Sequence, residues 1–135
     1  MVRVLLADDH AAFRDLVRGI LDDTADIRVV AEASDGDAAV AALRQYRPDV
    51  AILDLDMPGQ DGLRVASMAD KLEPSIKTIL LTVHKSPALL NKALIAGLCG
   101  YVLKDEAVDQ IADCVRRVHA GGRYFSRQLR GGNPS

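Results

Sequence analysis

Hydrophobic and polar positions along this chain alternate between two patterns. Short, nearly continuous apolar runs are typical of strands that are covered on both faces. Between them, apolar residues recur at spacings of three and four, which is typical of one face of a helix. The expected strands span residues 2–7, 27–33, 50–53, 76–82 and 100–103. The expected helices span residues 10–22, 35–46, 61–72, 87–97 and 105–120.

Several helix ends carry residues that commonly cap helices. Ser34 stands before the second helix with Asp37 three positions later, a pattern that indicates a capped start. Ser86 and Pro87 suit the N-cap and the first helical position of the fourth helix. Gly97 suits the end of that helix, because glycine readily adopts the left-handed conformation found there. Local chemistry and periodicity therefore indicate the same boundaries.

Five strand–helix pairs in strict alternation predict the fold class. Short crossover connections between successive strands imply a parallel sheet with helices on both faces. We expect an α/β, flavodoxin-like, doubly wound (βα)5 domain with strand order 2-1-3-4-5. Ligands of such folds bind at the carboxyl ends of the strands, so the residues that follow each strand are the candidates for function.

The composition excludes several functional classes. A chain of 135 residues suits one domain with a sizeable core, and a net charge of −2 offers no general attraction to nucleic acid or anionic membranes. No apolar run reaches the roughly 18 residues of a transmembrane helix, and the N-terminus lacks a signal-peptide pattern. Cys99 and Cys114 form no ligand cluster and suit reduced core thiols. We therefore expect a cytoplasmic protein without membrane attachment.

Reactive or ligating side chains follow four of the five expected strands. In chain order they are Asp8, Asp9, Asp54, Asp56, Thr82 and Lys104. The carboxyl ends of parallel strands meet at one edge of the sheet, so these acids, the hydroxyl and the lysine should converge there. None of the strand ends carries a glycine-rich phosphate loop, which argues against a Rossmann or P-loop nucleotide site.

Several carboxylates held together need a positive charge nearby. Without one they repel each other, and some take up protons. Ligands that are all oxygen suit Mg²⁺, which binds one or two carboxylates and keeps waters for phosphate oxygens; Mn²⁺ is a candidate substitute. With Lys104 as a second cation and Thr82 as a hydroxyl donor, a carboxylate at this edge is equipped to accept a phosphoryl group.

Each of these residues also has a purely structural interpretation. Asp8 and Asp9 could cap the helix that follows them. Thr82 could be an ordinary β-branched strand end, and Lys104 could be a surface lysine. Their joint placement at strand ends favours the functional interpretation. His10 lies beside the acids, but one histidine makes a poor case for a zinc site, so we expect it to be peripheral.

Four motifs resemble those of bacterial response-regulator receiver domains. They are LLADDH at 5–10, ILDLDMPGQDG at 52–62, LLTVH at 80–84 and GYVLKD at 100–105. Each motif is short, but their order, spacing and placement at strand ends make the joint signal specific over residues 2–120. The details ADDH, LTVH and GYVLKD are most similar to the NarL/FixJ (LuxR-type) class. The fold that this resemblance implies is CheY-like, in agreement with the strand–helix alternation.

The resemblance implies a role for each acid of the site. Asp54 would be the phosphoacceptor and a metal ligand, Asp9 would bind Mg²⁺ directly, and Asp8 would do so mainly through water. The backbone carbonyl of Asp56 would be the remaining protein ligand, with its side chain solvated beside the site. Gly59 would allow the tight turn that brings this carbonyl to the ion.

The resemblance also implies which residues respond to the phosphoryl group. Thr82 would hydrogen-bond a phosphoryl oxygen, and Lys104 would pair with the group. Tyr101 would be the switch aromatic that turns inward as Thr82 moves, although a tyrosine here also suits an ordinary core or surface position.

Partners and output follow from the same resemblance. A sensor histidine kinase would phosphorylate the domain, which is a phosphoacceptor and not a turnover enzyme, and phosphorylation would promote homodimerisation. Residues 1–121 would form the receiver and residues 122–135 a linker or tail. Members of this class usually control transcription through a C-terminal helix-turn-helix domain, which the tail is too short to hold. The chain is then a truncated regulator, which we favour, or a natural single-domain receiver, and DNA binding would need the absent domain.

Two other functions fit parts of the pattern. Asp54-Leu55-Asp56 after an apolar strand resembles the start of haloacid-dehalogenase-type phosphatases, but Met57-Pro58 and the preceding strand–helix pairs depart from that family. A phosphate-independent, receiver-like interaction module is the other alternative, and the complete set of acids with Thr82 and Lys104 argues against it.

Two positions depart from the common receiver pattern. Asp105 stands where many receivers have a proline with a cis peptide bond, so we expect a trans bond here. Val83 stands where the family often has a small residue. A bulkier side chain at this position is expected to restrict access to the phosphoryl group and to slow its transfer or hydrolysis.

Overall fold

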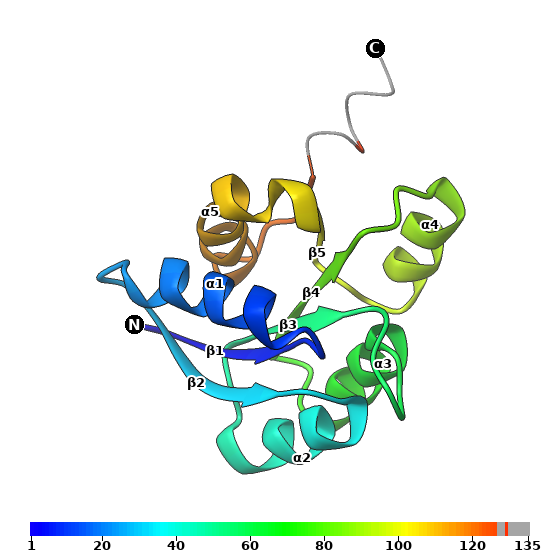
Figure 1. The fold of residues 1–135 in the computed structure, drawn as a ribbon. Coiled ribbons are helices and arrows are strands. Elements are labelled where there is room, and N and C mark those ends of the chain that lie inside the picture. The colour runs from blue at the N-terminus through cyan, green and yellow to red at the C-terminus, as the bar shows by residue number, and fades with distance from the viewer. Residues whose placement is uncertain (127–128, 130–135) are drawn as a thin grey trace.

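The computed structural model describes residues 1–126 and residue 129 (Figure 1). Its strands are β1 Val2–Ala7, β2 Ile27–Ala33, β3 Val50–Asp54, β4 Lys77–Thr82, β5 Gly100–Leu103 and β6 Tyr124–Phe125. Its helices are α1 Ala11–Asp22, α2 Gly36–Tyr46, α3 Gly62–Leu72, α4 Pro87–Ile95 and α5 Ala107–His119, with a short 3-10 turn, η1 Lys104–Glu106, directly before α5.

The strands form one parallel sheet in the order β2-β1-β3-β4-β5-β6. The predicted order 2-1-3-4-5 and the α/β class are confirmed. The sixth strand was not predicted, because two residues are too few to show an alternating pattern and the segment was assigned to the tail. The chain after α5 therefore begins by extending the sheet at its β5 edge.

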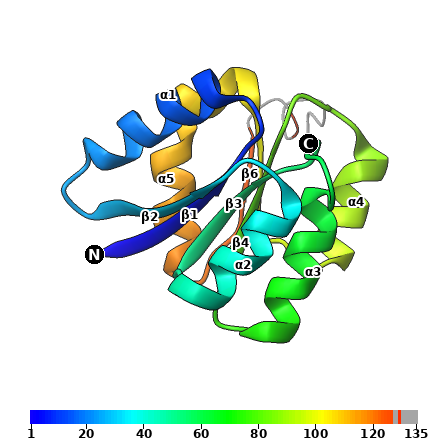
Figure 2. The ribbon, with the colours of Figure 1, turned by 60° about the horizontal axis from the view of Figure 1, so that its bottom comes forward.

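Helices cover both faces of the sheet, which explains why the strands are apolar throughout. Figures 1 and 2 show α1 and α5 on one side and α2 and α3 on the other. Val17, Leu21 and Ile111 belong to the first layer of the core, whereas Leu43 and Val65 belong to the second. All five residues of β3 are buried. A strand in this central position delivers its last side chain to the edge of the sheet with little freedom to move.

Most of the predicted helix starts are correct. The side chain of Asp61 accepts the backbone N–H of Arg64 at 2.9 Å, and Ser86 accepts that of Leu89 at 3.2 Å. The cap of α2 is Asp35 and not Ser34, as its side chain accepts the N–H of Ala38 at 2.7 Å.

The last predicted helix begins later than expected, because its first residues form η1. The described residues contain no cis peptide bond, so the bond before Asp105 is trans as predicted. Among residues 1–126 and 129, no helix is both long and apolar enough to cross a bilayer.

Candidate functional site

Two buried acids and one lysine meet at the carboxyl edge of the sheet. Asp8 follows β1, Asp54 ends β3 and Lys104 follows β5. The ammonium nitrogen Nζ of Lys104 lies 3.0 Å from Oδ2 of Asp8 and 3.2 Å from Oδ2 of Asp54. Asp8 and Asp54 are 0% and 1% exposed, so these charges interact out of bulk water. All three residues therefore lie together at the strand ends, where the sequence predicted them.

The turn that follows Asp54 is fixed by close backbone contacts. Gly59 adopts a positive φ of 81°, a conformation that favours glycine. The carbonyl of Pro58 accepts the N–H of Gly36 at 3.0 Å, which ties the turn to the start of α2. At Gly62, an added Cβ atom would lie 2.5 Å from the carbonyl oxygen of Asp54. The chain can fold back this tightly only because glycines stand at the points of closest approach.

The electrostatics of the site make Asp54 harder to ionise than an ordinary aspartate when no further cation is bound. Burial raises the pKa of the Asp54 carboxyl to about 6, the neighbouring charge of Asp8 adds to the rise, and Lys104 opposes it. Burial alone would lower the pKa of Lys104, but its bond to Asp8 and the charges of both carboxylates raise it. One lysine therefore compensates the two acids incompletely, and a second positive charge would lower the cost of ionising Asp54.

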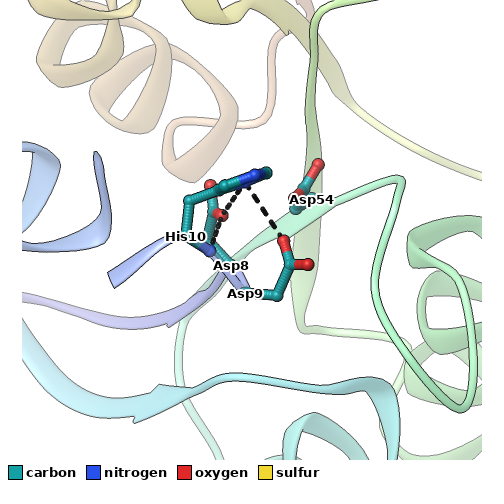
Figure 3. Close-up of side chains that lie close together, drawn as sticks. All are labelled: Asp8, Asp9, His10 and Asp54. Atoms are coloured by element: carbon teal, nitrogen blue, oxygen red, sulfur yellow. Dashed lines mark hydrogen bonds and ion pairs between the residues drawn. The ribbon is translucent and has the colours of Figure 1, made fainter. Parts of the chain in front are cut away.

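The side chains around Asp54 fit a small divalent cation. Asp8, Asp9, His10 and Asp54 each offer one ligand atom, and these atoms lie within 4.8 Å of one another. Figure 3 shows the carboxylates from the ends of β1 and β3 facing the same space. Oδ2 of Asp8 is buried, and it forms an ion pair with Lys104 at 3.0 Å. A cluster rich in carboxylate oxygen suits a hard cation.

His10 lies beside the acids, at the exposed mouth of the cluster. Its backbone N–H donates to Oδ1 of Asp8 at 2.8 Å, and its ring nitrogen Nδ1 lies 3.2 Å from Oδ1 of Asp9. The ring is 68% exposed, so it stands at the mouth of the cluster and not inside it. A position directly after two strand-end acids was the signal for this contact, although the sequence does not show which way the ring turns.

A second contact joins the loops that follow β3 and β4. The Asp56 side chain is 61% exposed, as expected for a solvated position, and its Oδ2 lies 2.8 Å from Nε2 of His84. The backbone N–H of Asp56 donates to Oδ1 of Asp54 at 3.3 Å. Sequence reasoning gave His84 no role. Both partners stand two positions after a strand-end residue of neighbouring strands, which is the pattern that could have revealed the pair.

Thr82 and Tyr101 both contact the loop that carries His84. Thr82 is buried at the end of β4, and its Oγ1 accepts the backbone N–H of His84 at 3.1 Å. Tyr101 is fully buried, and its hydroxyl donates to the backbone carbonyl of His84. The Tyr101 ring therefore occupies an inward position and holds the same loop from the side of β5.

Comparison with known proteins finds one matching family and relatives that are response or transcriptional regulators. Residues 4–116 match the response regulator receiver domain family. The response regulator UvrY of Escherichia coli (strain K12) is 38% identical over 129 residues, which cover 96% of this chain and 59% of UvrY. The probable transcriptional regulatory protein NarL of Mycobacterium tuberculosis is 40% identical over 119 residues, covering 85% of this chain and 55% of that protein. The chain thus spans little more than half the length of these relatives.

Solved structures show the same likeness in three dimensions. The LuxR-family two-component response regulator from Aurantimonas sp. SI85-9A1 superposes with a TM-score of 0.92 at 28% identity, covering 97% of this chain and 94% of that one. The signal receiver domain of the putative response regulator NarL from Mycobacterium tuberculosis superposes with a TM-score of 0.78 at 39% identity, covering 85% and 96%.

Proposed function

The chain belongs to the response regulator receiver domain family, and from this premise we propose that Asp54 accepts a phosphoryl group from a sensor histidine kinase. The family is one of phosphoacceptors and not of turnover enzymes. The observation that carries the assignment to Asp54 is its buried carboxylate at the end of β3, 3.2 Å from the ammonium of Lys104. The family match over residues 4–116 decides against the haloacid-dehalogenase alternative.

The transfer needs an ionised nucleophile and a site that stabilises charge. A carboxylate oxygen of Asp54 attacks phosphorus, the bond from phosphorus to the donor nitrogen breaks, and the electron pair of that bond leaves with the donor. Lys104 is already within ion-pair distance of Asp54, so it can pair with the phosphoryl oxygens without a large movement. We propose that the hydroxyl of Thr82 forms a hydrogen bond with the phosphoryl group. In this structure that hydroxyl accepts the backbone N–H of His84.

Mg²⁺ fits the cluster of acids beside Asp54. In this proposal the carboxylates of Asp9 and Asp54 would bind the ion directly, and Asp8 would contact it through water. The backbone carbonyl of Asp56 would be the remaining protein ligand. A bound Mg²⁺ supplies the positive charge that stabilises phosphate oxygens during transfer. The close grouping of the ligand atoms of Asp8, Asp9 and Asp54 and the raised pKa of Asp54 support this assignment.

The response to phosphorylation would pass through the loop that contains His84. Thr82 and Tyr101 both bind the backbone of His84, so a Thr82 that turns toward a phosphoryl oxygen releases one of two restraints on this loop. Tyr101 provides the other restraint, with its ring already inward in this structure, and we assign the role of switch aromatic to it. A phosphoryl group adds about −1.5 to −2 charges and three acceptor oxygens, which is enough to bias a loop held by a few hydrogen bonds.

The output of this domain would be control of transcription. The relatives are named as response regulators and transcriptional regulators, and this chain spans 59% of the first of them. We propose that residues 1–121 act as the receiver and that residues 122–135, of which 124–126 extend the receiver sheet, lead to a helix-turn-helix domain, through which DNA is bound. We also propose that the domain forms a homodimer when it is phosphorylated. It would act in the cytoplasm, where the kinase has ATP.

Intact-mass spectrometry tests the assignment of the phosphoacceptor. After incubation with Mg²⁺ and phosphoramidate, we expect one added phosphoryl group on the wild type and none on Asp54→Asn. Asp56→Asn is the matched control, since its exposed carboxylate should not accept the group. Equal labelling of Asp54→Asn would contradict the assignment, and a chain that takes up neither a phosphoryl group nor beryllofluoride would be a phosphate-independent module.

A further inference from the structure

The chain that leaves α5 turns back and attaches to the outer edge of β5. Gly121 adopts a positive φ of 97° at this turn. The backbone N–H of Tyr124 donates to the carbonyl of Cys99 at 3.0 Å, and that of Ser126 donates to the carbonyl of Tyr101 at 2.7 Å. Figure 2 shows the resulting strand β6 within the sheet. Residues 124–126 are therefore bonded to the strand that carries Tyr101 and leads into Lys104.

Ser126 is the most constrained residue of this segment. It is fully buried, although serine is usually exposed. Its Oγ accepts the backbone N–H of Leu103 at 3.2 Å and donates to the carboxylate of Glu106. The side chain of Gln110, itself 3% exposed, completes the group, because its Nε2 donates to Oε2 of Glu106 at 3.1 Å and its Oε1 lies 3.4 Å from Oγ of Ser126.

These bonds hold residues that come shortly before and shortly after Lys104 in the chain. Leu103 is the residue before Lys104, and Glu106 is the last residue of η1, which Lys104 begins. Ser126 thus fixes the backbone on entry to this turn and the side chain at its exit. Lys104 must reach two acids at 3.0 and 3.2 Å, and such distances depend on where its backbone is held.

We propose that Ser126 is a positioning residue for Lys104, so that attachment of residues 124–126 and phosphoryl binding at Asp54 are linked. This inference rests on the proposed function. A segment that holds Lys104 in place strengthens phosphoryl binding, and by thermodynamic reciprocity a phosphoryl group strengthens attachment of the segment.

A titration with beryllofluoride in the presence of Mg²⁺, followed by NMR, tests this link on the full chain. Ser126→Ala removes the hydroxyl, and we expect binding to weaken about two- to tenfold, the range that a typical hydrogen bond contributes. Ser126→Thr keeps a hydroxyl and should restore binding. Ser75→Ala is the matched control, because its hydroxyl bonds Glu73 at an exposed site away from Lys104 and should not alter affinity.

Amide hydrogen exchange provides the reciprocal measurement without any substitution. In the wild type, exchange at Tyr124 and Ser126 should slow when beryllofluoride binds, by about the factor that Ser126→Ala loses in affinity. Faster exchange at these amides in Ser126→Ala with unchanged beryllofluoride affinity would overturn the inference. A wild type that does not bind beryllofluoride at all would overturn the proposed function, and this inference with it.

Discussion

Replacing Asp54 by asparagine tests the electrostatic description of the site independently of any phosphorylation. In the wild type, Asp54 is buried beside Asp8, and its pKa is raised to about 6 from the ordinary 3.8. The folded protein therefore holds this proton more tightly than the unfolded chain does. Below pH 3.8 the carboxyl is protonated in both states, and no cost arises. As the pH rises through about 6, the folded state must pay for ionising a buried group, so stability falls.

The size of the effect follows from the shift. A rise from 3.8 to about 6 corresponds to about 3 kcal/mol between the two protonation states. Asparagine carries no charge at any pH, so Asp54→Asn should avoid most of this cost. We expect the variant to be more stable than the wild type by about 1–3 kcal/mol at pH 7.5 without divalent cations. The difference should shrink toward zero at pH 4.

Urea unfolding in EDTA at pH 4 and pH 7.5 measures this difference, and Asp70→Asn serves as control because Asp70 is exposed on α3. Adding Mg²⁺ at pH 7.5 should then stabilise the wild type more than Asp54→Asn, since a ligand that binds the folded state raises its stability. If Asp54→Asn were no more stable than the wild type at pH 7.5 in EDTA, the charge repulsion inferred for this site would be wrong.

Four further predictions concern packing and reactivity. Gly62→Ala should destabilise the protein by about 1–3 kcal/mol because its Cβ would lie 2.5 Å from a backbone oxygen. Gly19 has open space around it, so Gly19→Ala should stabilise α1 by up to about 1 kcal/mol. Urea unfolding measures both changes in stability. Burial raises the pKa of the Cys114 thiol, so Cys114 should resist alkylation by iodoacetamide under native conditions while the partly exposed Cys99 reacts; equal rates would contradict the placement of Cys114. Val83 is 66% exposed at the end of β4, and Val83→Ala should speed loss of the phosphoryl group, so an unchanged rate would refute a role for its bulk.

The sequence predicts the features that follow from the positions of residues at the ends of strands and helices. Asp8, Asp54 and Lys104 were found because each follows an apolar run, and parallel topology brings such positions to one edge. The N-cap Ser86 was found because capping is a local interaction, although the cap of α2 proved to be Asp35 and not Ser34. These features require only the order of elements along the chain and the chemistry of neighbouring residues.

The features that were missed depend on contacts between segments far apart in the sequence. The pair of Asp56 and His84 forms only once two loops take particular conformations, and their matching positions after neighbouring strands do not show how those loops turn. Strand β6 is too short to show a periodic pattern. Serine is a common residue in exposed tails, so Ser126 did not stand out in the sequence. Only the arrangement of β5, η1 and α5 shows why this serine is buried. Long-range hydrogen bonds of this kind are set by packing and not by propensity.

The most direct test of the central claim is to locate the phosphoryl group chemically. Borohydride reduces an acyl phosphate on aspartate to the alcohol, so treatment of the phosphorylated protein followed by peptide sequencing marks the residue that carried the group. The account predicts conversion of Asp54 alone, dependent on Mg²⁺ and on the phosphoryl donor. Conversion at Asp8, Asp9 or Asp56, or none in a protein that gains the mass of a phosphoryl group, would contradict it.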